Sequence, residues 1–268
     1  MKSHTLFLLV ISLFIQSCKD TKKEETTANT DTQEVVADNS SKEKPVSDIK
    51  IIPIQHATTV LEYKGKTIYM DPTGGAKAFE NQKLPDLVLI TDIHGDHMNI
   101  ETLNSLDLSK SKIIVPQAVA EKLPANYTDQ LVIINNGEVK DVAGISIEAI
   151  PMYNLREEAL KFHEKGRGNG YVITLGDERL YFSGDTEDIP EMRALKNIDK
   201  AFVCMNLPYT MTVESAAGAV LEFKPKQVYP YHYRGTDGLS NIIKFRETVN
   251  KGNSEIEVVQ LNWYPTIK

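Results

Sequence analysis

The chain has little cysteine and no excess of positive charge. Only Cys18 and Cys204 occur in 268 residues, so a framework of several disulfides is excluded. The formal net charge of −7 argues against a nucleic acid or an anionic membrane surface as the main partner, because both favour a basic face. No short-period repeat is present. What remains is a globular protein long enough to bury a substantial core.

The first residues predict an export signal. A short basic start precedes the apolar run Leu6–Ile15, which is too short to span a bilayer and is typical of a signal peptide. The segment Ile15–Cys18 resembles the lipobox of bacterial lipoproteins, which implies that Cys18 carries a lipid. The alternative is an ordinary secretory signal with an incidental cysteine. The resemblance implies a bacterial cell-envelope location, with a lipid anchor as the one membrane contact, on the periplasmic or the surface face.

Composition divides the chain into three parts. Residues 1–17 are expected to be the lipoprotein signal peptide, and residues 18–48 the lipidated cysteine and a disordered tether. The tether is rich in Lys, Thr, Glu and Ser, and it cannot bury enough surface to offset the entropy of ordering it. Residues 49–268 contain no second linker and are expected to form the folded domain.

The folded part predicts an α/β architecture. Strand-rich halves, each ending in helices, indicate two sheets packed together with helices outside. The expected helices are 99–106, 117–123, 190–195 and 213–223, with a further helix before the last strand. The expected strands are 49–54, 59–63, 66–70, 86–90, 113–115, 131–134, two within 138–152, 171–175, 179–182, 201–205, 228–229 and 256–261.

The strongest chemical signal is the segment Thr91–His97, which follows the apolar run Leu87–Ile90. A chain that leaves a buried strand can point alternate side chains into one cavity, and imidazole and carboxylate are the groups that hold zinc and similar ions. An incidental polar loop is the alternative. The possible ligands in this segment are Asp92, His94, Asp96 and His97.

Three further residues extend this pattern. A glycine turn after the strand 179–182 presents Asp185, and His232 ends the strand near Tyr229. His163 lies in the charged, glycine-rich loop Glu157–Gly170, where the alternative is a surface histidine. Cys204 lies in an apolar run, which is more typical of an inert core thiol than of a nucleophile.

In this order the motifs resemble the metallo-β-lactamase superfamily, whose leading motif is H-x-H-x-D-H after a strand. Gln55–Thr58 and Met70–Pro72 resemble the branch that contains L-ascorbate-6-phosphate lactonase and N-acyl-phosphatidylethanolamine phospholipase D. The resemblance implies an αββα sandwich of two mixed sheets, with two divalent metal ions at one edge. Asp92 replaces the first motif histidine, and this harder oxygen donor favours manganese or iron over the expected zinc, or lowers occupancy of the first site.

The resemblance also implies roles for residues. Asp185 would bridge the two metals, and Asp96 would orient the nucleophile. The first metal would be held by Asp92, His94 and His163, and the second by Asp96, His97 and His232. Four other residues are expected to contact the substrate or support a ligand: His56, Asn206, Tyr209 and Arg234.

The implied activity is metal-dependent hydrolysis. A metal-activated hydroxide would attack an ester, lactone, amide or phosphodiester bond, with Asp96 and Asp185 as the catalytic carboxylates. No covalent intermediate is expected, because no serine or cysteine is paired with a spare histidine. The substrate is a small molecule or a lipid that the sequence does not identify, and the oligomeric state stays open. The alternatives are a non-catalytic binding module with a partly decayed site, and a redox diiron protein of the same fold.

Overall fold

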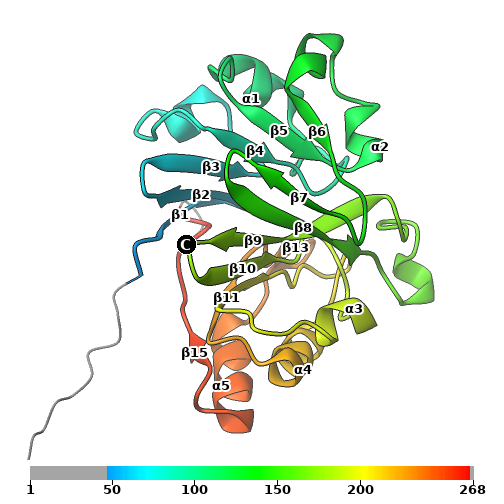
Figure 1. Ribbon diagram of the computed structural model, residues 1–268. Helices are drawn as coiled ribbons and strands as arrows, with labels where there is room; N and C mark the ends of the chain where they lie inside the picture. Colours follow the sequence, from blue (N-terminus) through cyan, green and yellow to red (C-terminus); the bar gives the residue numbers. More distant parts are fainter. Residues whose placement is uncertain (1–46, 266–268) are drawn as a thin grey trace, which may run out of the picture. The chain divides into compact units, whose positions relative to one another are not determined.

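The structure is a computed structural model that describes residues 47–265. The expected signal peptide, Cys18 and all but the end of the tether lie outside the described residues. Two mixed sheets pack face to face, and helices lie on the outer side of each (Figure 1). The predicted α/β sandwich is confirmed. Within residues 47–265 no helix combines the length and apolar character needed to cross a bilayer.

The first sheet carries the leading motif. Its first three strands pair antiparallel, and the later neighbours pair parallel. The strand order is β1 (Lys50–Gln55), β2 (Thr58–Tyr63), β3 (Lys66–Met70), β4 (Leu87–Leu89), β5 (Lys112–Val115) and β6 (Leu131–Ile133). Two helices, α1 (Ile100–Ser105) and α2 (Gln117–Ala120), lie outside this sheet (Figure 1). Two 3-10 helices, Ala76–Phe79 and Ala125–Gln130, complete its connections.

The second sheet supplies the rest of the candidate site. The strand order is β15 (Glu257–Val258), β12 (Gln227–Pro230), β11 (Lys200–Val203), β10 (Glu178–Phe182), β9 (Gly168–Leu175), β8 (Ile145–Met152) and β7 (Val139–Val142). The strands from β10 to β15 pair parallel, and those from β7 to β10 pair antiparallel. Outside it lie α3 (Pro190–Arg193), α4 (Val213–Phe223) and α5 (Ile242–Gly252) (Figure 1).

Alternation along the strands produces the layers. Successive side chains of a strand point to opposite faces of its sheet. Leu87 and Leu89 therefore face the second sheet and share a core with Ile173 of β9. Val88 faces the other way and shares a separate core with Leu103 of α1. One sheet thus buries both of its faces, one against the second sheet and one against helices.

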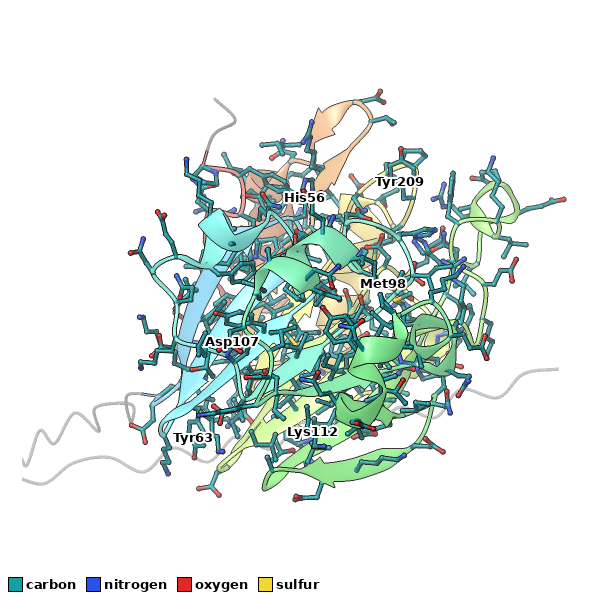
Figure 2. All side chains as sticks on the ribbon, turned by 90° about the horizontal axis from the view of Figure 1, so that it is seen from above. His56, Tyr63, Met98, Asp107, Lys112 and Tyr209 are labelled. Atoms are coloured by element: carbon teal, nitrogen blue, oxygen red, sulfur yellow. The ribbon has the colours of Figure 1, made fainter. Side chains whose placement is uncertain are left out.

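The two sheets bring the candidate loops to one edge of the sandwich. In the first sheet β4 runs parallel to β3 and β5, and in the second sheet β10, β11 and β12 run parallel to one another. The carboxyl ends of parallel strands meet at one edge of their sheet. Figure 2 shows His56 and Tyr209 towards this edge, and Tyr63 and Lys112 towards the opposite one.

Two local features differ from the sequence-based expectation. Strand β9 begins at Gly168, inside the segment expected to be loop. A side chain at Gly168 would meet the Thr91 carbonyl oxygen at 2.9 Å, and the Asn169 amide donates a 2.9 Å hydrogen bond to that oxygen. Glycine is thus required because this strand passes close to the backbone after β4. The small hairpin of β13 (Arg234–Gly235) and β14 (Gly238–Leu239) was also not expected.

Candidate metal centre

Six of the expected ligands form two groups at the shared edge. Within each group the possible donor atoms lie within 4.8 Å of one another. We name the groups site one and site two. Site one consists of Asp92, His94 and His163, and site two consists of Asp96, His97 and His232.

Asp185 lies between the two groups. Its Oδ2 atom is 3.3 Å from His163 Nε2 of site one and 3.4 Å from His97 Nε2 of site two. Its Oδ1 atom is 3.2 Å from His232 Nε2. One buried carboxylate therefore faces both groups, which is the arrangement that the expected bridging role requires.

The segment after β4 supplies ligands to both sites, and a turn within it directs His94 to site one and His97 to site two. The His97 amide donates to the His94 carbonyl oxygen at 3.0 Å, so the chain turns tightly between these histidines. Helix α1 is capped by Asn99, whose side chain accepts a 2.8 Å hydrogen bond from the Thr102 amide. Asp96 has no capping role, and its carboxylate lies 3.4 Å from His232 Nε2 with 45% of the side chain exposed.

Asp71, which sequence reasoning did not assign a role, lies behind His97. Its buried carboxylate is 2.9 Å from His97 Nδ1, and it accepts hydrogen bonds of 2.7 Å from both the amide and the hydroxyl of Thr91. This pairing turns Nε2 of His97 towards Asp185, because the other ring nitrogen is engaged. The segment Met70–Pro72 was noticed in the sequence, but nothing there shows what Asp71 contacts.

The loop that carries His163 is held by polar contacts. Asn154 follows β8, and its amide group donates to the carbonyl oxygens of Ala159 (2.9 Å) and Tyr209 (2.7 Å). The same Tyr209 oxygen lies 3.2 Å from His163 Nδ1. His163 is buried, so it is not the surface histidine considered as the alternative.

Arg167 is the second residue that sequence reasoning missed. Its guanidinium pairs with both carboxylate oxygens of Asp92, with Nε 3.1 Å from Oδ1 and Nη2 3.0 Å from Oδ2. The Oδ2 atom also lies 2.7 Å from His94 Nδ1 and 4.0 Å from His163 Nε2. The signal that could have pointed to Arg167 was Asp92, the acidic residue in place of the first motif histidine. A buried carboxylate requires a charged or hydrogen-bonding partner.

The four residues expected beside the ligands have different surroundings. Asn206 Nδ2 lies 3.4 Å from His232 Nε2, and the Tyr209 carbonyl oxygen lies 3.2 Å from His163 Nδ1. The ring of His56 lies 5.7 Å from that of His232, and its carbonyl oxygen accepts a 3.1 Å hydrogen bond from the His232 amide. Arg234 is exposed at the start of β13.

Burial and nearby charges shift the pKa values of these histidines in opposite directions. Burial, with the repulsion of His232, lowers the pKa of His56 to about 4, so this ring is neutral near pH 7. Burial also opposes the charged form of His232, but Asp185 and Asp96 outweigh it and raise its pKa to about 9. The pKa of Asp185 is held well below its usual range, against the effect of burial, chiefly by His232 and His97.

The donor set fits a divalent metal ion. His97 Nε2 and Asp185 Oδ1 are buried and make no hydrogen bond within the described residues. Buried polar atoms nearly always have a hydrogen-bond partner, so a buried imidazole nitrogen and a buried carboxylate oxygen that lie close together without one fit the ligand atoms of a cation. Imidazole nitrogens and ionised carboxylates are also the ligand types that zinc, manganese and iron bind, and a bound cation would take the place of the proton that the raised pKa puts on His232.

The backbone at this edge is strained at three residues. His56 (φ 47°), Asp71 (φ 43°) and His232 (φ 43°) adopt the left-handed conformation, which is uncommon for residues other than glycine. This conformation costs energy, so a residue keeps it only where the surrounding structure imposes it. Residues of this kind cluster at functional sites. Their location beside site two agrees with a site whose geometry is imposed by the fold.

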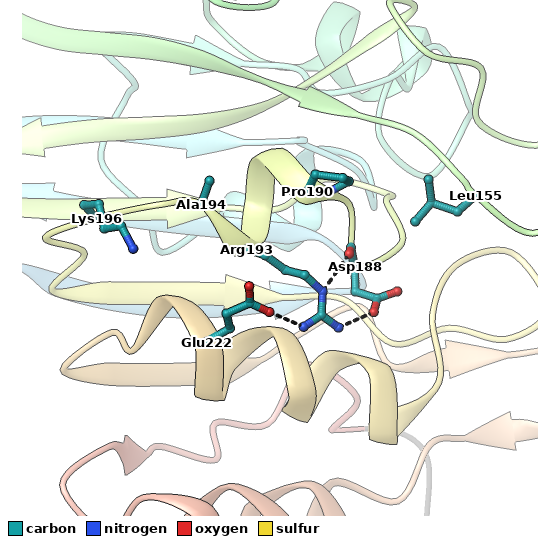
Figure 3. Close-up of a pocket in the computed structure, with 7 residues that line it drawn as sticks. All are labelled: Leu155, Asp188, Pro190, Arg193, Ala194, Lys196 and Glu222. Atoms are coloured by element: carbon teal, nitrogen blue, oxygen red, sulfur yellow. Dashed lines mark hydrogen bonds and ion pairs between the residues drawn. The ribbon is translucent and has the colours of Figure 1, made fainter.

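A separate cavity of about 530 Å³ contains none of the candidate ligands. Arg193 spans it, pairing with Asp188 at 2.5 Å and with Glu222 of α4 at 2.6 Å (Figure 3). Three of its charged groups, Arg193, Asp188 and Glu222, therefore pair with one another. The complete lining is Leu155, Asp188, Pro190, Arg193, Ala194, Lys196 and Glu222.

A sandwich of two mixed sheets with histidines and carboxylates at one edge defines a metallohydrolase type of fold and site. The chain belongs to the β-lactamase superfamily, whose family model, described as a beta-lactamase superfamily domain, matches residues 50–232. A metal-dependent hydrolase of Pyrococcus horikoshii is 30% identical over 194 residues, which cover 69% of this chain and 84% of the relative.

Solved structures agree with this assignment. A metal-dependent hydrolase from Parabacteroides distasonis superposes with a TM-score of 0.71 at 35% identity, covering 79% of this chain and 92% of the other. Igni18, a metallo hydrolase from Ignicoccus hospitalis, gives a TM-score of 0.67 at 22% identity, covering 80% of this chain and 95% of the other. At that identity the second structure supports the fold alone.

Proposed function

We propose that this chain is a metal-dependent hydrolase that holds two divalent cations, zinc in the first instance, with manganese or iron as alternatives. The observation that carries the proposal is Asp185, a buried carboxylate within 3.4 Å of histidines from both sites. The reaction class is supported by the relatives, which are described as metal-dependent hydrolases. The ligands would be Asp92, His94 and His163 in site one, Asp96, His97 and His232 in site two, and Asp185 in both.

The chain's own groups would act on a water molecule and on the substrate. A bound divalent cation lowers the pKa of water towards neutrality, which is the chemistry that the metal supplies. Asp96, partly exposed beside His232, would accept a proton or a hydrogen bond from the attacking water. Asp185 would fix the separation of the two sites. His56, neutral near pH 7, would contact the substrate without adding charge.

The substrate bond would be an ester, lactone, amide or phosphodiester, in a small molecule or a lipid. A covalent enzyme intermediate is not part of the proposal. Cys204 is buried, and burial raises its pKa to about 11, so its thiol is a poor nucleophile near neutral pH. Within the superfamily we favour the L-ascorbate-6-phosphate lactonase-like branch, which rests on the sequence around His56 and Asp71.

We also propose that the protein is a lipoprotein of the bacterial cell envelope, anchored through Cys18 on the periplasmic or the surface face. The apolar run Leu6–Ile15 and the lipobox-like segment before Cys18 support this location. The domain would then occupy residues 49–268, with residues 18–48 as the tether. Nucleic acid is not an expected partner, given the net charge of −7.

One observation favours a second candidate, a non-catalytic metal-binding or ligand-binding module. Arg167 already pairs with both oxygens of Asp92, so one expected metal ligand has a competing partner. Hydrolysis assays distinguish this candidate from the enzyme.

The test compares purified protein stripped of metal with the same protein resupplied with zinc or manganese. Aryl esters, lactones and an aryl phosphodiester are the substrates. We expect metal to restore hydrolysis, and His97→Ala to lower it by more than about 100-fold, because His97 is a ligand in site two. Asp188→Ala, a change outside the ligand set, should leave it intact. Metal binding without hydrolysis of any of these bonds would favour the non-catalytic module.

A further inference from the structure

The two sites differ in the charge that lies behind their ligands. In site one, the Asp92 carboxylate is fully buried and is paired through both oxygens with the Arg167 guanidinium, whose side chain is 17% exposed. In site two, the group behind His97 is the carboxylate of Asp71, 2.9 Å from its Nδ1 atom. A fixed positive charge therefore lies behind the ligands of site one, and a fixed negative charge lies behind the ligands of site two.

The position of Arg167 is determined by more than Asp92. Its Nη2 atom also donates a short hydrogen bond to the Phe162 carbonyl oxygen, next to His163. The residue following it, Gly168, begins β9 beside the Thr91 carbonyl oxygen. Arg167 is thus held between the two segments that supply site one. Since arginine stays protonated in proteins, its charge remains whether or not a cation arrives.

We propose that Arg167 makes the two metal sites unequal. Site two binds the first cation tightly, and site one binds the second cation weakly. A cation in site one must share the Asp92 oxygens with a guanidinium that repels it, whereas a cation in site two gains a ligand oriented by Asp71. Arg167 acts through Asp92 and is therefore a positioning residue. This inference rests on the proposed binding of metal at both sites.

Exposure does not separate the two sites, because each has one partly exposed ligand: 40% of the His94 side chain in site one and 45% of the Asp96 side chain in site two are exposed. The inequality therefore comes from charge, and the more weakly held cation is the one in site one. We therefore expect the second cation to be lost first when the protein is diluted or dialysed.

The first test is a zinc titration of the full-length chain, stripped of metal, in competition with a chelating dye. The expected result is two binding constants that differ by about 100-fold or more, since like charges a few ångström apart in protein are strongly unfavourable. His94→Ala should remove the weak constant and keep the tight one, and His97→Ala should remove the tight one. Two equal constants would overturn the inference. No zinc binding at all would instead contradict the proposed function.

The second test changes the charge itself. Arg167→Met should tighten the weak constant by about tenfold or more and leave the tight one unchanged, because it removes the repulsive charge. Arg167→Lys keeps the charge and should keep the two constants apart. Arg179→Met is the matched control, since Arg179 pairs with Glu148 at the far end of β10 and should change neither constant.

A weak constant that is unchanged or weaker in Arg167→Met would mean that Arg167 only holds the fold. If this variant does not fold, the wild-type titration and the His94→Ala variant still decide whether site one is the weaker site.

Discussion

Replacing Asp185 with alanine is expected to abolish hydrolysis and lower the metal content, with the fold largely retained. Among residues 47–265, Asp185 is the carboxylate that faces both sites, so its loss removes one ligand from each site and leaves three buried histidines without their shared counter-charge. We expect turnover to fall by more than about 100-fold, since even groups that only support ligands change metal affinity or activity by 10–100-fold. Elemental analysis and an esterase assay measure the two effects.

The control for this variant is Asp188→Ala, three residues further along the same loop. Asp188 pairs with Arg193 and touches none of the proposed ligands. It should keep both metal content and turnover, and circular dichroism should show both variants folded. Full metal loading and full turnover in Asp185→Ala would contradict the binuclear assignment.

Replacing Asp71 with asparagine is expected to weaken binding of the first cation by about 10- to 100-fold, although Asp71 would not itself touch the metal. The carboxylate accepts hydrogen bonds from the Thr91 amide and hydroxyl and faces His97 Nδ1. An asparagine side chain has one acceptor oxygen in place of the two carboxylate oxygens. Its NH2 group would face the Thr91 or His97 atoms that now face an Asp71 oxygen. The His97 ring would then lose the partner that turns its Nε2 atom towards Asp185.

The comparison is with Asp86→Asn. The Asp86 carboxylate also accepts a hydrogen bond from a backbone amide, that of Thr67, but Asp86 lies just before β4, whereas Asp71 directly follows β3. Its variant should bind zinc as tightly as the wild type. An Asp71→Asn protein with unchanged zinc affinity would show that the hydrogen bond to His97 has no part in metal binding.

Much of the fold follows from local patterns in the sequence. The helix expected over 213–223 is observed with those bounds, because Thr212 caps it and alanines with other apolar residues line its buried face. Strand β8 extends the apolar alternation of Ile145 and Ile147. Such elements are predictable because the residues that determine them lie within one or two turns of the chain.

Contacts between distant segments were not predictable in this way. Gly168 looked like part of a loop, and only the closeness of Thr91 explains why a glycine-rich segment forms a strand. Arg167 is 75 residues from Asp92, and no local sequence pattern around either residue predicts that the two side chains pair. The candidate ligands could be proposed from the sequence because most of them follow a strand, and the carboxyl ends of parallel strands converge.

The central claim is that site one and site two each hold a divalent cation beside Asp185. Anomalous diffraction at the zinc edge, from crystals of the protein grown with excess zinc, tests it most directly. The account predicts two peaks, one among Asp96, His97 and His232 and a second, of lower occupancy, among Asp92, His94 and His163, with Asp185 next to both. The absence of any peak at this edge of the sandwich, or zinc bound only elsewhere, would contradict it.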